Sequence, residues 1–305
     1  MKKIVSIIMA VILLTLSSCT KKDNRKEKAA EALYGLIGGE EVLQDREQLP
    51  VGSSVTDWIY FTLALSGKED KEYLAELEEY ITSVYNEDGC LSADRPTEYH
   101  RTALTILALG GDPTHTGTDR NIDLIKDGTS GFEGFEDMPL NSIIYALITL
   151  NSRAYDREYA DKLKKVLLNA QNSDGSWGLY ENSADADITA MAIQSLAPFI
   201  TENETDKAIK NAFSWLGKTE ITSSETVSQT IIALCLCGMS PKETDKFSFN
   251  GISADEMLES FLKPDGYAHN TEDEKGNLTA TQQALLALCA EERYENNENG
   301  IYIFD

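Results

Sequence analysis

The stretch FTLAL at residues 61–65 ends an apolar run, and five similar phrases follow it along the chain. They read TILAL to Leu109, LITL to Leu150, IQSL to Leu196, ALCL to Leu236 and LLALC around Leu288. Counted from Leu65, successive anchor leucines lie 44, 41, 46, 40 and 52 residues apart. Each step leaves room for two helices and two turns, and a period of this length is typical of repeated helical hairpins.

Six hairpins of this kind predict a fold class. Because one hairpin cannot bury its apolar face alone, six of them either stack into an open solenoid or close into a ring. We predict the closed form, an all-α (α/α)6 toroid, which is a double-walled barrel of six helical hairpins. Amphipathic segments between the apolar phrases predict its outer wall, at residues 73–84, 159–170, 209–216 and 257–262, with further outer elements at 28–43 and, most weakly, at 121–126.

The N-terminal segment has the pattern of an export signal. Two lysines precede an apolar run at residues 4–16, which is too short to span a bilayer stably. The run ends in LSSC at residues 16–19, which resembles the lipobox of bacterial lipoproteins, in which the cysteine is lipidated and becomes the mature N-terminus. The resemblance implies a signal peptide at 1–18, lipidation of Cys19, a basic tether at 19–28 and a toroid domain at 29–305.

An ordinary secretory signal, with Cys19 incidental, is the alternative for this segment. Both interpretations place the mature protein outside the cytoplasm. The lipobox further predicts anchoring to the cell membrane on its extracytoplasmic face, with the basic tether held against anionic lipid headgroups.

Composition excludes several classes of partner. The chain carries 27 basic and 51 acidic residues, a net charge of −24, so it would repel a nucleic acid backbone. No CxxC or HxxxH spacing occurs among its cysteines and three histidines, and we predict no metal and no cofactor. Cys235 and Cys237 lie two apart on one expected helix and point to different faces, which makes a bridge between them implausible.

Residues 171–177 read QNSDGSW and match Q-x3-G-x-W. This resembles the QW motif of the terpenoid cyclase and protein prenyltransferase family of toroids. In that family the glutamine and tryptophan tie the end of an outer helix to its neighbour. The resemblance therefore implies a structural role for Gln171, Gly175 and Trp177, and it extends over residues 29–305.

The phrase DADITA at residues 185–190 resembles the D-x-D-D-T-A motif with which squalene-hopene cyclases protonate an alkene. In that motif a neighbouring carboxylate raises the pKa of the middle aspartate, which is Asp187 here. Ile188 replaces the third aspartate, and three tryptophans and nine phenylalanines are few for a pocket that stabilises carbocations. A terpene cyclase-like enzyme, with Asp187 as general acid, Asp185 beside it and Tyr99 or Tyr145 nearby, is therefore the alternative function.

The overlapping phrase DITAMA at residues 187–192 also resembles the D-T-G-A-M-A phrase of cobalamin carriers such as intrinsic factor and transcobalamin. The nearest resemblance is to bacterial secreted proteins with prenyltransferase/squalene oxidase repeats, which carry phrases like TEYHR at 97–101 and SETVSQ at 224–229. In the carriers the matching aspartate and glutamine touch the corrin amides. The resemblance thus implies ligand contacts by Asp187 and Gln229, with Gln282 as a third.

Counting back eight or nine residues from each anchor leucine reaches the expected starts of the inner helices. Two interpretations of the polar residues there stay open. They cap exposed backbone N–H groups, as we expect for Asp57, Asn141, Ser228 and Thr279, or they form a polar mouth over an apolar floor that orients an organic ligand. The ligand-binding candidates are Asp187, Gln229, Gln282, Tyr99, Arg101, Glu98, Asn141 and Glu225. For Arg101, a pairing with Glu98 or Asp187 that only holds the mouth together is equally open.

We therefore predict a lipid-anchored, extracytoplasmic toroid that binds a small organic ligand, with a corrinoid as one candidate, or an extracytoplasmic partner protein. Catalysis by Asp187 and Asp185 is the alternative function. A structural or adhesive surface protein is the third possibility.

Overall fold

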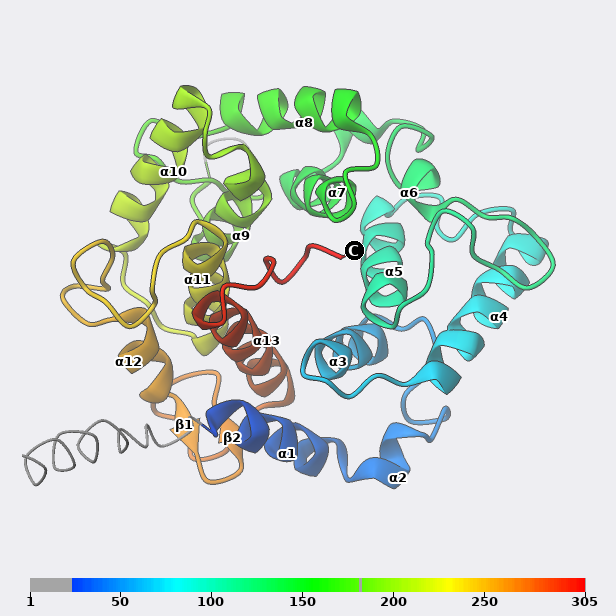
Figure 1. Ribbon diagram of the computed structural model, residues 1–305, viewed down its shortest axis with the longest axis horizontal. Coiled ribbons are helices and arrows are strands. Elements are labelled where there is room, and N and C mark those ends of the chain that lie inside the picture. The colour runs from blue at the N-terminus through cyan, green and yellow to red at the C-terminus, as the bar shows by residue number, and fades with distance from the viewer. Residues whose placement is uncertain (1–23, 181–182, 305) are drawn as a thin grey trace, which may run out of the picture.

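The computed structural model describes residues 24–180 and 183–304 and contains the predicted ring. Six inner helices stand around a common axis (Figure 1). Each packs against the next in chain order, and the last packs against the first, so the ring is closed. They are α3 (Ser54–Leu65), α5 (Pro96–Ala108), α7 (Leu140–Asn151), α9 (Ala186–Leu196), α11 (Ser224–Leu236) and α13 (Leu278–Glu295). The all-α toroid is confirmed.

An outer layer of helices surrounds this ring (Figure 1). It consists of α1 (Arg25–Ile37), α4 (Lys71–Glu87), α8 (Arg157–Asn169), α10 (Asn203–Leu216) and α12 (Ala254–Glu259), with the single turns α2 (Glu40–Leu43) and α6 (Leu124–Asp127). The predicted outer segment at 28–43 is divided into α1 and α2, because Gly38 and Gly39 both have positive φ. The weakest predicted element, at 121–126, is represented by α6 alone.

Three short elements complete the described chain. Two are 3-10 turns, η1 (Phe135–Asp137) and η2 (Ala197–Phe199). The third is an antiparallel hairpin of β1 (Leu262–Lys263) and β2 (Gly266–Tyr267), which packs beside the start of α13.

Residues 25–28, which we expected to belong to a basic tether at 19–28, form the first turn of α1. Arg25 pairs with Asp255 of α12 and with Glu291 of α13, and Lys26 pairs with Glu292. These basic side chains hold α1 to the barrel. The predicted signal peptide and Cys19 lie outside the described residues, and no helix within 24–180 or 183–304 is long and apolar enough to cross a membrane.

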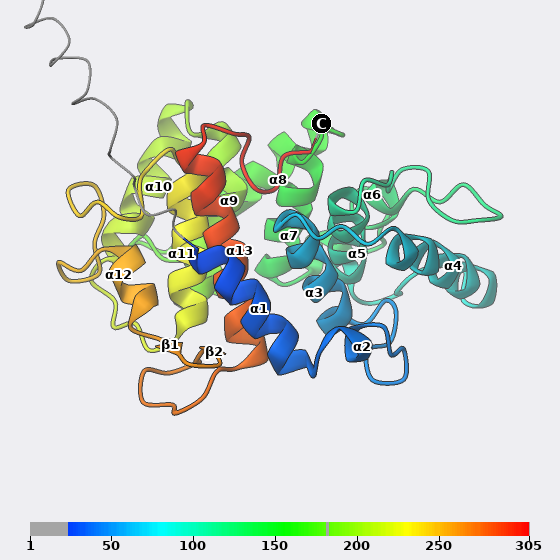
Figure 2. The ribbon, with the colours of Figure 1, turned by 60° about the horizontal axis from the view of Figure 1, so that its bottom comes forward.

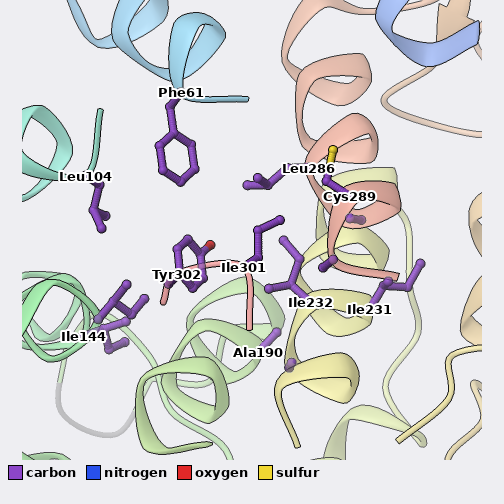
Figure 3. Packing of buried hydrophobic residues seen from close by; sticks show 14 of the residues in the cluster. Phe61, Leu104, Ile144, Ala190, Ile231, Ile232, Leu286, Cys289, Ile301 and Tyr302 are labelled. Atoms are coloured by element: carbon purple, nitrogen blue, oxygen red, sulfur yellow. The ribbon is translucent and has the colours of Figure 1, made fainter. Parts of the chain in front are cut away.

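An apolar floor closes one end of the barrel. Side chains from all six inner helices surround Ile301 and Tyr302 of the C-terminal segment (Figure 3). Both residues are buried, and the backbone N–H of Phe304 donates to the carbonyl of Ser152 just after α7. The C-terminal segment therefore fills the axis at the C-terminal ends of the inner helices.

The QW-like turn joins two outer helices. The side-chain N–H groups of Gln171 donate to the carbonyls of Gly175 and of Ala208 in α10, each at 2.9 Å. Trp177 is fully buried, and its indole N–H donates to the carbonyl of Leu167 in α8 at 2.8 Å. Gly175 has a φ of +97°, which other residues rarely adopt. These contacts tie the end of α8 to α10.

Candidate functional site

The inner helices begin at the end of the barrel opposite the C-terminal segment, near the β1–β2 hairpin (Figure 2). We call this end the mouth. Several of these helices start about one turn before the expected position, because the capping side chains lie upstream. Each capping oxygen accepts a backbone N–H three residues later, and the four caps are Ser53, Asp185, Ser223 and Asn277.

The capping prediction for Asp57, Asn141, Ser228 and Thr279 is therefore wrong. These residues lie inside the first turns of their helices. Ser228 instead donates its hydroxyl to the carbonyl of Ser224 at 2.8 Å, within α11.

Arg101 is locked into a buried ion pair. Its Nε donates to Oδ2 of Asp57 at 2.9 Å, its Nη1 to Glu98 at 2.6 Å and its Nη2 to the carbonyl of Gly52 at 2.8 Å. Burial raises the pKa of Asp57, while the Arg101 charge and a 2.5 Å hydrogen bond from the Tyr73 hydroxyl act in the opposite direction. The partner expected from the sequence, Glu98, is present, but Asp57 takes the place of Asp187. Arg101 thus joins α3 to α5.

Tyr99 does not line the mouth as the sequence suggested, whereas no contact tests the predicted role of Asn141. Tyr99 is buried, and its hydroxyl donates to the carbonyl of Ser92 at 2.9 Å, so it faces the loop before α5 and not the axis. The prediction that its side chain lines the mouth is wrong, because the ring packs edge-on to Phe132 in the outer part of the repeat. Asn141 is half-buried at the start of α7, and its side chain makes no hydrogen bond with the described residues.

Gln229 belongs to an amide network that links three inner helices. The side-chain N–H of Gln194 in α9 donates to both the backbone and the side-chain oxygen of Gln229 at 2.8 Å. Gln229 in turn donates to Oε1 of Gln283 in α13 at 3.1 Å. The Tyr302 hydroxyl donates to Gln194 at 3.2 Å, which connects this network to the floor.

Gln282 is engaged in a similar way on the other side of α13. Its side-chain N–H donates to the hydroxyl of Thr62 in α3 at 2.5 Å. Gln229 and Gln282 are only 9% and 7% exposed. Both candidate ligand contacts therefore also hold neighbouring helices together.

Asp187 is one of the candidates that remain partly accessible, with Glu98, Asn141 and Glu225. It is half-buried in the first turn of α9 and accepts a 2.5 Å hydrogen bond from the hydroxyl of Thr226 in α11. Burial raises the pKa of Asp187, and the negative charges of Asp185 and Glu225 act in the same direction. The Thr226 hydrogen bond and nearby His269 partly offset this shift. Asp187 is thus a partly desolvated carboxyl group beside two others.

Glu225 has a partner that the sequence did not indicate. Its Oε2 lies 2.9 Å from Nδ1 of His269, which follows β2 and is 50% exposed. This contact ties the mouth end of α11 to the segment after the hairpin.

Aromatic side chains line the axis from the mouth to the floor. The rings of Trp58 in α3 and Tyr145 in α7 lie 5.8 Å apart, and both are half-buried. Burial and the charge of Asp187 raise the pKa of Tyr145 to about 12. Trp58 also contacts Phe61 edge-on at 5.3 Å, and Phe61 stacks on Tyr302 at 6.2 Å. The mouth therefore combines a carboxylate with aromatic surface.

Sequence reasoning missed Trp58, Thr226 and Gln283. Trp58 directly follows Asp57, and Thr226 lies inside the phrase already singled out at 224–229. The available signal was their position in the first turns of inner helices.

The chemistry of the mouth is that of carboxyl, hydroxyl, amide and aromatic groups. Among residues 24–180 and 183–304, no group of three or more histidine, cysteine or acidic side chains could hold a metal ion. The four cysteines in these ranges are free thiols.

Comparisons with known proteins support the fold. No family model and no curated protein matches the chain. A solved structure of the type II terpene cyclase MstE from Scytonema, bound to the substrate geranylgeranyl dihydroxybenzoate, is similar with a TM-score of 0.53. The two share 12% sequence identity, and the alignment covers 89% of this chain and 98% of the cyclase chain. The fold is therefore terpenoid cyclase-like, while the expected relation to cobalamin carriers finds no support.

Proposed function

We propose that the toroid is a binding protein for a small organic ligand, and that the mouth receives a positively charged nitrogen of that ligand. The observation that supports this most is the position of Asp187. Its carboxylate is partly desolvated and lies near Tyr145, whose ring contacts that of Trp58. All three keep part of their surface exposed although they lie on inner helices. Since the outer wall covers the other side of these helices, the exposed parts face the axis.

A cation in this position gains from two interactions. It neutralises a carboxyl group whose raised pKa reflects its burial and the neighbouring Asp185 and Glu225 charges. It also lies against aromatic faces, and a cation–π contact contributes roughly 0.5–2 kcal/mol depending on desolvation. A neutral ligand of the same shape gains neither, so the mouth should select for charge.

The test is a thermal melt with choline and with its uncharged isostere 3,3-dimethyl-1-butanol. A ligand at about a hundred times its dissociation constant should add roughly 2.7 kcal/mol to the free energy of unfolding. We expect choline to raise the melting temperature and the alcohol to leave it unchanged. Asp187→Asn should abolish the shift, whereas Asp245→Asn, which removes an exposed charge elsewhere, should keep it.

Equal shifts with both compounds, or a full shift in Asp187→Asn, would refute charge selection at the mouth. A corrinoid run in parallel tests the ligand class suggested by the sequence. If no small ligand shifts the melt, a partner protein or a structural role becomes the better explanation.

A second candidate function is catalysis by Asp187 as a general acid, supported by its raised pKa and by the cyclase-like fold. The Asp187 carboxyl would transfer its proton to an alkene carbon, and the aromatic rings would stabilise the resulting cation. After attack by a second alkene of the chain closes the ring, the cation would lose a proton to water, and solvent would reprotonate Asp187. Incubation with geranylgeraniol in D2O tests this. A deuterated cyclic product that Asp187→Asn fails to form supports catalysis, and the absence of product with the wild-type protein contradicts it.

Membrane anchoring through Cys19 is also a proposal, supported by the LSSC phrase at residues 16–19. Cells that express the protein should incorporate labelled palmitate into it, and Cys19→Ser should abolish the label. Label that persists in Cys19→Ser would contradict lipidation at this residue.

A further inference from the structure

A pocket lies on the outside of the barrel, between α10 and the segment that follows α11. Its volume is about 580 Å³, within the range of roughly 300–1,000 Å³ that small-molecule sites occupy. Residues from three places along the chain line it: 200–218, 237–239 and 246–248. It is therefore separate from the mouth, none of whose residues takes part.

The floor of this outer pocket is apolar. It is formed by Ile209, Phe213, Met239 and Phe247, and the ring centres of Phe213 and Phe247 lie 5.5 Å apart. Burial raises the pKa of the Cys237 thiol to about 12, so that side chain is neutral at physiological pH. The floor thus suits a hydrocarbon chain.

The rim of the pocket is basic in a strongly acidic protein. Lys210, Lys218 and Lys246 line it together with one carboxylate, Asp206, whereas the chain as a whole has 51 acidic and 27 basic residues. Lys210 pairs with Asp206 at 2.7 Å, and among the described residues the Lys218 ammonium donates only to the hydroxyl of Ser214, at 3.1 Å.

Lys246 makes no ion pair or hydrogen bond with any residue in the described ranges. Two ammonium groups at the rim, those of Lys218 and Lys246, therefore lack an anionic partner within residues 24–180 and 183–304.

We propose that this outer pocket binds a free fatty carboxylate, with its chain on the apolar floor and its carboxylate between Lys218 and Lys246. An apolar chain supplies the area burial that drives binding, and the anionic end meets uncompensated positive charge. The net charge of −24 repels anions elsewhere on the surface, so the lysines confine the carboxylate to this rim. The inference does not depend on the function proposed for the mouth.

The experiment is a calorimetric titration of the protein with decanoate, decanol and decyltrimethylammonium, each below its aggregation concentration. We expect decanoate to bind, decanol to bind several-fold more weakly, and the cation to show no binding. Because exposed charges are screened by salt, decanoate affinity should fall between low and high ionic strength.

Variants locate the site. An exposed ion pair contributes up to about fivefold in affinity, so the double variant Lys218→Ala/Lys246→Ala should bind decanoate roughly tenfold more weakly. Cys237→Phe should reduce binding by filling the pocket. Lys165→Ala, at an exposed lysine on α8, and Asp187→Asn at the mouth should both bind like the wild-type protein.

Several outcomes would overturn the proposal: no decanoate binding, equal binding of decanol, or unchanged binding in the double lysine variant. The double variant changes only exposed side chains, so it remains informative if Cys237→Phe fails to fold. Binding to phosphatidylglycerol vesicles without binding to free decanoate would instead assign the basic rim to a membrane surface.

Discussion

His100 should make the stability of this protein depend on pH in a defined direction. The imidazole is fully buried in α5, and its Nε2 lies 2.7 Å from the carbonyl oxygen of Gly128. Since a carbonyl only accepts, Nε2 carries the hydrogen. Nδ1 is then unprotonated, and it has no partner in the described part of the chain. Burial lowers the pKa of His100 to about 4.

The sign and size of the effect follow from this pKa. In the unfolded chain the histidine pKa is about 6.5, so between pH 6.5 and 4 the unfolded state takes up a proton that the folded state does not. Folding stability is therefore lost as the pH falls through this window. The loss from this one group amounts to about 2 kcal/mol at pH 5 and about 3 kcal/mol at pH 4.

Guanidinium unfolding at pH 7 and pH 5, on the wild-type protein and on His100→Gln, measures this contribution. The glutamine keeps an N–H donor but takes up no proton, so the stability advantage of the wild type should shrink by about 2 kcal/mol between the two pH values. Burial raises the pKa of Glu291 to about 7, so this carboxyl group takes up a proton in the same pH range and stabilises the folded state as the pH falls. Because Glu291 is present in both proteins, its contribution cancels in the difference.

His115→Gln provides the matched control, because that imidazole is 67% exposed, and its profile should parallel the wild type. A wild-type advantage over His100→Gln that stays constant within about 0.5 kcal/mol would show that the buried imidazole is not held neutral.

Three further substitutions test other contacts. Trp177→Phe keeps most of the buried ring but loses the indole hydrogen bond, and denaturant unfolding should show a loss of about 1–3 kcal/mol; a neutral result would contradict a structural role for the motif. Arg101→Met leaves the buried Asp57 without its cation and should cost about 3–5 kcal/mol, while a cost below about 1 kcal/mol would show that the pair is dispensable. Thr226→Val removes a hydrogen bond that lowers the pKa of Asp187, so an NMR titration should find a higher value, and an unchanged one would contradict the contact.

The fold could be predicted from the sequence because its signal is local and repeated. Each apolar phrase is buried on nearly all sides, and each outer segment has one buried face. The spacing of the apolar phrases along the chain therefore predicts the alternation of inner and outer helices. The QW-like turn is equally local, since its glutamine, glycine and tryptophan lie within residues 171–177. The last residues of the chain gave no such signal, although Ile301 and Tyr302 complete the floor.

The sequence predicted which end of the barrel carries the polar mouth, but it did not predict which polar side chains pair with one another there. The starts of α3 and α11 were set about one turn too late, because Ser53 and Ser223 cap from upstream of the counted positions. Arg101 pairs with Asp57, 44 residues away, and the packing of α5 against α3 brings these two together. Gln229 likewise bonds to Gln194 and Gln283 on neighbouring helices. Such pairings decide which polar groups remain free for a ligand. The repeat period of the sequence does not reveal them, because they form between side chains on different helices.

The closure of the ring has a consequence for the order of folding. Arg25 in α1 contacts Glu291 in α13 across 266 residues, whereas Arg101 and Asp57 are 44 residues apart. By loop-closure entropy, the longer contact costs roughly 1.5 kcal/mol more to form. Neighbouring hairpins can assemble as the chain emerges, but the first hairpin keeps an uncovered apolar flank until the sixth arrives. The rate-limiting event should therefore be the meeting of the first and sixth hairpins, after synthesis is complete.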